Sequence, residues 1–97
     1  MEWTFSADVF AWGEDGPSWR FLRLPLDVAD EVRDLAGEPA GFGSVRVHAR
    51  IGQTVFATSV FPEKASGSYL LPVKKSVRER EGIDDGDRVT VRLDVAS

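Results

Sequence analysis

The stretch YLLPVKKSVREREGIDDGDRVTVRL, residues 69–93, decides the fold of this 97-residue chain. It has the pattern of a short strand that ends in Leu-Pro, a two-turn helix, an acidic turn and a second strand. Pro72 lacks an N–H and has a preset φ, so it suits the entry to a helix. Gly82 stands where a helix needs a left-handed residue, and Ile83 can pack back on the last turn. The stretch therefore predicts a strand–helix–turn–strand unit.

The second strand of this unit is amphipathic. From position 89 to position 95, valine and leucine alternate with threonine, arginine and aspartate. A period of two residues is typical of a strand with one buried face. The preceding turn, residues 84–87, combines aspartates that bond their own backbone with Gly86, which tolerates a positive φ.

The rest of the chain supplies partners for this unit. Apolar and polar residues alternate in further predicted strands at residues 3–11, 19–24, 45–51 and 54–61. Pro25 opens a predicted helix over residues 26–36. The segments GEDGP, residues 13–17, and GEPAGFG, residues 37–43, are rich in glycine and proline and are predicted loops.

Gly52-Gln53 predicts a type II′ hairpin, because glycine stands at the first of the two turn positions. Such a turn sets the register of the two strands that flank it, with Ile51 opposite Thr54 and Val45 opposite Val60. One face of the hairpin is then apolar. The other face presents Arg46, His48 and Arg50 with Val55, Ala57 and Ser59.

The two halves of the chain repeat the same order of elements. The segment FLRLP, residues 21–25, is followed by a helix, a loop and a strand, as is YLLP, residues 69–72. The repeat concerns element order more than residue identity. It predicts a mainly β fold, a closed barrel of six to seven strands with two short helices over its open ends, built as a single-chain pseudo-dimer.

The motif LPxxxRxxxGxxxGDxVxV, with a tolerance of a residue or two, resembles the swapped-hairpin proteins of the AbrB, MazE and MraZ type. The matching residues are Leu71, Pro72, Arg78, Gly82, Gly86, Asp87, Val89 and Val91. Those proteins use about half this length per chain, and two chains intertwine to close one barrel.

The whole chain, from residue 3 to residue 95, resembles still more a small bacterial family known as a domain of unknown function (number nineteen-oh-five). The similar segments include FLRLP, TSVFP and GSYLLPVKKSVR. Members of that family often sit beside a domain related to bacteriocin-protection proteins. The resemblance implies a double-split β-barrel, no established activity, and a protein partner or bacteriocin-protection-like domain as one class of partner.

Size and composition indicate one domain, residues 1–97. No apolar stretch approaches the length of a membrane span, and zero cysteines fit a cytoplasmic protein, so we expect a soluble, cytoplasmic chain without a membrane partner. The formal charge is −4 with a pI of about 4.9. A net negative protein is repelled by nucleic acid unless its basic residues gather on one face.

The usual sequence signatures of nucleophilic catalysis are missing, and an arrangement of a serine with His48 is the one alternative that the sequence leaves open. There is no cysteine and no G-x-S-x-G, and the single histidine, His48, stands between arginines on a predicted strand. No glycine pattern matches a phosphate-binding loop. The aspartates at 84, 85 and 87 lack the spacing of an EF-hand and suit a turn. We therefore predict that the protein is not an enzyme, with no catalytic residue, metal site or cofactor.

A non-enzymatic binding or interaction module of unknown partner is the predicted function. One alternative is an AbrB- or MazE-like DNA-binding protein of the transcription-factor or antitoxin type, which the resemblance favours and the net charge disfavours. Its phosphate contacts would come from Arg46, Arg50, Lys74, Lys75 and Arg78. A solvated charged surface is the simpler interpretation of these residues.

The other alternative is a small-ligand pocket at the barrel mouth. Trp12, Trp19 and Phe42 stand in or beside glycine-rich loops, and Tyr69 begins the motif of residues 69–93. Aromatic side chains at such places line pockets. They also serve as loop anchors that cap a core. The predicted pocket residues are Trp12, Trp19 and Tyr69.

Overall fold

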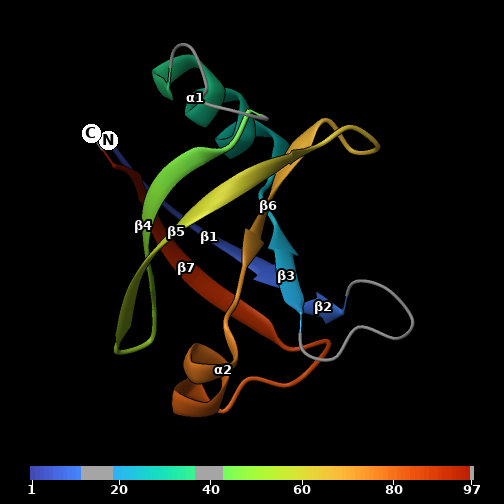
Figure 1. The fold of residues 1–97 in the computed structure, drawn as a ribbon, viewed down its shortest axis with the longest axis vertical. Helices are drawn as coiled ribbons and strands as arrows, with labels where there is room; N and C mark the ends of the chain where they lie inside the picture. Colours follow the sequence, from blue (N-terminus) through green and yellow to red (C-terminus); the bar gives the residue numbers. More distant parts are fainter. Residues whose placement is uncertain (12–18, 37–42, 97) are drawn as a thin grey trace.

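The structure is a computed structural model that describes residues 1–11, 19–36 and 43–96 (Figure 1). These parts of the chain contain seven strands and two helices, and every strand pairing is antiparallel. In chain order, the elements are β1 (Glu2–Asp8), β2 (Phe10–Ala11), β3 (Arg20–Arg23), α1 (Leu26–Ala36), β4 (Val45–Ile51), β5 (Thr54–Glu63), β6 (Ser68–Pro72), α2 (Lys75–Glu81) and β7 (Arg88–Val95). The predicted mainly β fold with two short helices is confirmed.

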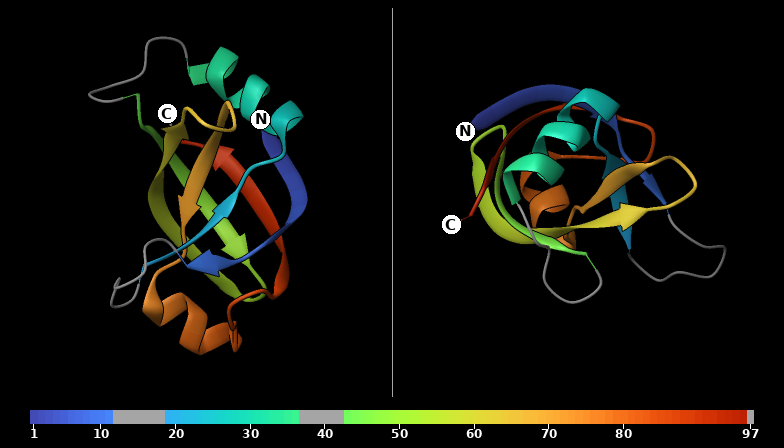
Figure 2. Two further views of the ribbon diagram at one scale, coloured as in Figure 1. Left: turned by 90° about the vertical axis from the view of Figure 1, so that its right-hand side faces the viewer. Right: turned by 90° about the horizontal axis from the view of Figure 1, so that it is seen from above.

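The strand order is β1-β7-β4-β5-β6-β3-β2, and both ends of this order come from one stretch of chain. β1 pairs with β7 and β2 pairs with β3, while only Val9 separates β1 from β2. β5 likewise pairs with β4 over residues 54–60 and with β6 over residues 61–63. The sheet therefore curls on itself into a barrel-like shape (Figures 1 and 2).

The core fills the inside of this curled sheet. β4 alternates buried and exposed residues along its whole length, and its valines, Ala49 and Ile51 are the buried set. The alternate residues of the N-terminal strand, Trp3, Phe5, Ala7 and Val9, are also at most 8% exposed. The inward faces agree with the alternation in the sequence, because burial of apolar surface selects the register that hides these side chains.

The two helices lie at opposite ends of the curled sheet (Figures 1 and 2). α2 ends at Gly82 with φ 63°, and the N–H of Ile83 donates to the carbonyl of Arg78 at 2.9 Å. Ile83 is 8% exposed, as the predicted helix end requires. Within the described residues, neither helix is long and apolar enough to cross a membrane.

The predicted role of Pro72 as the entry to a helix is wrong. Pro72 is the last residue of β6, opposite Phe21 of β3, and α2 begins only at Lys75. Pairing with β3 continues to Val73, whose N–H donates to the carbonyl of Arg20 at 2.9 Å. This long-range hydrogen bond keeps the chain extended past the proline.

Arg23 of β3 and Glu63 at the end of β5 form an ion pair that is joined by two hydrogen bonds. The guanidinium Nε and Nη2 donate to the two carboxylate oxygens at 2.5 and 3.0 Å, and Ser66 Oγ donates to the same carboxylate at 2.6 Å. The Arg23 bond, followed by the Ser66 bond, lowers the pKa of Glu63 from its usual 4.5. A lowered pKa means that the pair stabilises the fold above this value, and that the contribution is lost as the pH falls through the pKa of the folded state.

We expect Glu63→Gln to destabilise the protein near neutral pH and to differ less from the wild type in acid. The difference in free energy of unfolding, measured by urea titration between about pH 3 and pH 7, should shrink as the pH falls below 4.5. Glu79→Gln is the matched control, because Glu79 is 67% exposed and lies 3.8 Å from Lys75. If the difference in free energy of unfolding between Glu63→Gln and the wild type stayed constant across this pH range, the stabilising role of the ionised Glu63 would be contradicted.

Candidate functional site

The outward side chains of four strands form one continuous polar surface. Alternation turns every second residue of β1, β7 and β4 away from the core, and the start of β5 extends this surface. We call it the arginine face, and its residues are Glu2, Thr4, Ser6, Asp8, Arg46, His48, Arg50, Val55, Arg88, Thr90, Arg92 and Asp94.

Three acidic residues of the arginine face each have a basic neighbour. Asp8 lies 3.1 Å from Arg88, and Glu2 lies 3.6 Å from Arg92. His48 Nδ1 lies 3.4 Å from Asp94 Oδ1, which is within ion-pair range although Oδ1 has no hydrogen bond to any described residue. These pairs are exposed, so each contributes little to stability.

Arg46 and Arg50 of β4 have no acidic partner among the described residues. Arg50 is exposed, and its Nε donates to the carbonyl of Gly52 at 3.1 Å. With four arginines, three carboxylates and a neutral His48, the arginine face has a net charge of +1 in a chain of formal charge −4. Basic charge is therefore concentrated on this surface.

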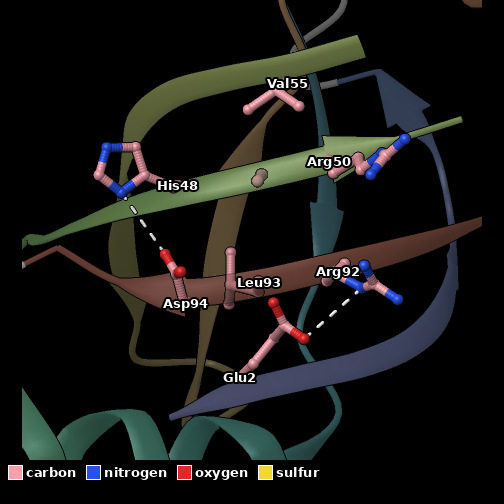
Figure 3. Close-up of a pocket in the computed structure, with 8 residues that line it drawn as sticks. Glu2, His48, Arg50, Val55, Arg92, Leu93 and Asp94 are labelled. Carbon is pink, nitrogen blue, oxygen red and sulfur yellow. Dashed lines mark ion pairs between the residues drawn. The ribbon is translucent and has the colours of Figure 1, made fainter. Parts of the chain in front are cut away.

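The arginine face also carries two shallow hollows that share Arg50 and Arg92. One has a volume of about 190 Å³ and is also lined by His48, Asp94 and Glu2 (Figure 3). The other has a volume of about 440 Å³ and is lined by Thr4, Arg50, Gly52, Thr90 and Arg92. Both are open to solvent, so they suit a ligand group that enters from outside.

The predicted nucleic-acid residues fall into two groups. Arg46 and Arg50 lie on the arginine face, whereas Lys74, Lys75 and Arg78 belong to α2 and its N-terminal cap at one end of the curled sheet (Figure 1). Lys75 lies 3.8 Å from Glu79, and Arg78 Nε donates to the carbonyl of Val73 at 3.2 Å. These contacts of the helix cations fit the solvated-surface interpretation better than they fit a shared site.

Glu81 connects α2 to the β4–β5 hairpin. Its Oε2 accepts hydrogen bonds from Thr54 Oγ1 at 2.7 Å and from the N–H of Gln53 at 3.3 Å. A carboxylate therefore stands where the helix meets the hairpin, next to the end of the arginine face. This negative charge separates the helix cations from the strand arginines.

The predicted pocket residues lie apart where the structure describes them. Trp19 is 62% exposed and stacks on Phe21 with ring centroids 6.2 Å apart, whereas Tyr69 is 3% exposed, with the Arg33 guanidinium 5.3 Å from its ring. The N–H of Leu24 donates to the carbonyl of Tyr69, and Trp19 lies five residues before Leu24, about 16 Å away along an extended chain. Trp12 and Phe42 are outside the described residues. The ligand pocket stays a prediction.

The aspartates of residues 84–87 form a turn closed by two hydrogen bonds. The N–H of Asp84 donates to Asp87 Oδ2 at 2.8 Å, and the N–H of Asp87 donates to the carbonyl of Asp84 at 3.1 Å. Asp87 is thus used within its own turn, as the sequence predicts. In the part of the chain that the structure describes, no three histidine, cysteine or acidic residues are grouped to hold a metal ion.

Sequence reasoning missed the contribution of β7 to this surface. Arg88, Arg92 and Asp94 alternate with buried residues, so their outward direction was readable from the pattern. Their position beside β4 was not readable, because about forty residues separate the two strands along the chain.

Comparison with models of known protein families finds a match over most of the chain. A family model described as "Domain of unknown function (DUF1905)" matches residues 5–93, which include all seven strands in whole or in part and both helices. No curated protein matches the chain.

Proposed function

The chain belongs to the DUF1905 family, a domain of unknown function, and from this premise we propose that it is a non-enzymatic binding module. Its contact surface is the arginine face, and its partner is an extended anionic molecule. The observation that carries this proposal is the pair of arginines on β4, Arg46 and Arg50, which lack an acidic partner among the described residues.

An arginine without an acidic partner binds an external anion at a lower cost than a paired one. Arg88 and Arg92 must give up or share a carboxylate when a partner arrives, but Arg46 and Arg50 have none to give up. Guanidinium groups also form two parallel hydrogen bonds to carboxylate or phosphate groups. The chain's net charge of −4 opposes long-range attraction. The face therefore acts at contact range, within a Debye length of about 10 Å at 0.1 M salt.

The chemistry of the site supports binding without catalysis. The chain has no cysteine, and its one histidine, His48, has a side chain that is 56% exposed and lies beside Asp94. A solvated histidine on an open sheet face lacks the enclosed surroundings in which side chains are usually activated as bases or nucleophiles. The absence of cysteine also fits our proposal that the protein is cytoplasmic.

A nucleic acid is the specific partner that the AbrB and MazE resemblance favours. Arg46 and Arg50 are four residues apart on one strand, about 13 Å, so both could contact one extended backbone. The acidic net charge and Glu81 at the hairpin disfavour it. An acidic protein segment is the other class of extended anion that the same arginines would bind.

The pairing register supports a further proposal, that the fold is a double-split barrel built as a single-chain pseudo-dimer. The β3–β6 ladder is symmetric about its central pair, Arg23–Leu70. On one side of this pair Leu22 lies opposite Leu71, and on the other side the N–H of Leu24 donates to the carbonyl of Tyr69. The β4–β7 ladder is symmetric about its central pair, Ala49–Leu93. Val47 and Ile51 of β4 correspond to Val91 and Val95 of β7, so exchanging the halves turns the pair Val47–Val95 into the pair Ile51–Val91. An experimental structure whose halves, residues 2–51 and 54–95, superpose by a two-fold rotation would test this proposal.

Binding to labelled polyanions tests the proposed function. We expect random duplex DNA, random single-stranded DNA or polyglutamate to raise fluorescence anisotropy at low salt, with an affinity that falls as salt rises. Arg46→Glu/Arg50→Glu should weaken this binding at least about tenfold, a change of about 1.4 kcal/mol. Lys64→Glu/Arg80→Glu is the matched control. It changes the net charge equally through exposed residues outside the arginine face. Failure of all three polyanions to bind at low salt would refute the proposal.

A further inference from the structure

Two arginines stand directly opposite one another in the middle of the arginine face. The register of the β4–β7 ladder pairs Arg50 with Arg92, and Figure 3 shows the two side chains next to one another on neighbouring strands. Neighbouring strands are about 4.8 Å apart, so the two side chains leave the sheet close together, and both line the same hollow. Like charges in directly opposed positions destabilise a sheet. An anion placed between them would relieve this repulsion.

The hollow above this pair has a lining suited to an anion. The side chains around its volume of about 440 Å³ come from Arg50, Arg92, Thr4 and Thr90, and no carboxylate of the described residues lines it. Thr4 lies opposite Arg92 in the β1–β7 ladder, so one row across the sheet presents a hydroxyl and two guanidinium groups. Every side chain in this lining is therefore able to donate a hydrogen bond.

Both arginines have donors to spare. Arg50 uses Nε on the carbonyl of Gly52, and its terminal nitrogens have no partner among the described residues. Arg92 has Glu2 at 3.6 Å, but both side chains of that pair are 55% exposed. An ion pair so exposed contributes little, so an incoming anion competes with it readily.

We infer that Arg50 and Arg92, with Thr4 and Thr90, form a subsite for one phosphate group of a phosphorylated ligand. A phosphate monoester has a charge near −2 and a phosphodiester has a charge of −1. Both have acceptor oxygens arranged tetrahedrally around phosphorus, which match two guanidinium groups and two hydroxyls better than the two coplanar oxygens of a carboxylate do. This inference rests on the proposed function, since it names the chemistry that the arginine face recognises.

Titration with inorganic phosphate tests the subsite directly. The Nε–H resonances of Arg50 and Arg92 are followed by NMR while phosphate replaces chloride at constant ionic strength. We expect both resonances to shift and to saturate. Arg92→Gln should weaken phosphate binding at least about tenfold. Arg80→Gln, which changes an exposed arginine of α2 outside the arginine face, should leave it unchanged.

Two further measurements distinguish a variant that has lost the subsite from one that fails to fold. Arg50→Lys and Arg92→Lys retain the charge, but they lose the fork of parallel donors, so they should bind phosphate more weakly than the wild type. The amide spectrum of each variant shows whether the fold persists. The inference would be overturned if phosphate shifted neither resonance, or if added chloride alone caused the same shifts. It would also be overturned if the Arg50 resonance still shifted with phosphate in a folded Arg92→Gln variant.

The source of the phosphate is distinguished by competition. A nucleoside monophosphate that moves the same two resonances, while random DNA fails to displace inorganic phosphate, indicates a free phosphorylated molecule. Displacement by DNA indicates the nucleic-acid backbone. Polyglutamate binding that survives while phosphate moves neither resonance means that the subsite is wrong and the proposed function stands. Saturable phosphate binding without any polyanion binding supports the subsite and refutes the proposed function.

Discussion

Leu71→Ala is expected to lower the free energy of unfolding by about 2–5 kcal/mol. Leu71 lies on β6 directly opposite Leu22 of β3, and both side chains are 0% exposed. β3 comes from the N-terminal half of the chain and β6 from the C-terminal half, so this contact packs the halves together. The smaller side chain leaves a cavity that strands held by ladders on both sides cannot close. A domain of this size has a total stability of about 5–15 kcal/mol, so the loss is a large fraction.

Urea denaturation followed by tryptophan fluorescence measures this loss. Leu26→Ala is the matched control, because it removes the same atoms from a side chain that is 58% exposed at the start of α1. A surface change of this kind should alter stability by about 0.5 kcal/mol or less. Equal losses for the two variants would show that the β3–β6 contact is not part of the core.

Gly52→Ala is expected to destabilise the protein by about 2–5 kcal/mol, from two costs that add. Gly52 has φ 59°, a left-handed value that costs a residue with a Cβ about 1–3 kcal/mol. The new Cβ would also come within 1.9 Å of Glu81 Oε1, so the Glu81 side chain must move. It would then lose its hydrogen bonds to Thr54 Oγ1 and the N–H of Gln53.

Gly67→Ala separates these two costs. Gly67 also has a positive φ, 75°, but a Cβ there has nothing within 4 Å, so only the backbone cost applies. We expect Gly52→Ala to be the more damaging of the two. In a Glu81→Ala background, the cost of Gly52→Ala should fall toward that of Gly67→Ala, because the hydrogen bonds are already absent. Equal costs of both glycine variants in the wild-type background would contradict the role of Glu81.

The register of the β4–β5 hairpin could be predicted from the local sequence alone. The sequence predicts Ile51 opposite Thr54 and Val45 opposite Val60, and the β4–β5 ladder has both pairs. Gly52 has a positive φ and Gln53 does not, as a type II′ turn requires. A two-residue turn determines the pairing of every residue that follows it, so no distant contact is needed for this prediction.

The division of the N-terminal strand could not be predicted from the local sequence. Its alternation predicts one strand over residues 3–11, but the chain divides at Val9 into β1 and β2, which pair with different strands. The N–H of Val9 donates to the carbonyl of Asp87, and its carbonyl accepts from the N–H of Gly86. These partners lie almost eighty residues away. A distant contact also decides the conformation at Pro72, where pairing with Phe21 of β3 prevails over the tendency of proline to open a helix.

The sequence by itself determined which residues of β1, β4 and β7 point inward, where the helices end and how the β4–β5 hairpin pairs, because periodicity and turn chemistry act over a few residues. It also placed Arg46, His48 and Arg50 on one outward face. Only the tertiary structure brought Arg92 opposite Arg50, since that requires β7 to pair with β4 across about forty intervening residues. The arginine pair and its hollow are therefore properties of the sheet. The arginine pair exists because β7 lies beside β4 in the sheet. This strand order is selected by the packing of the whole core and not by any local segment.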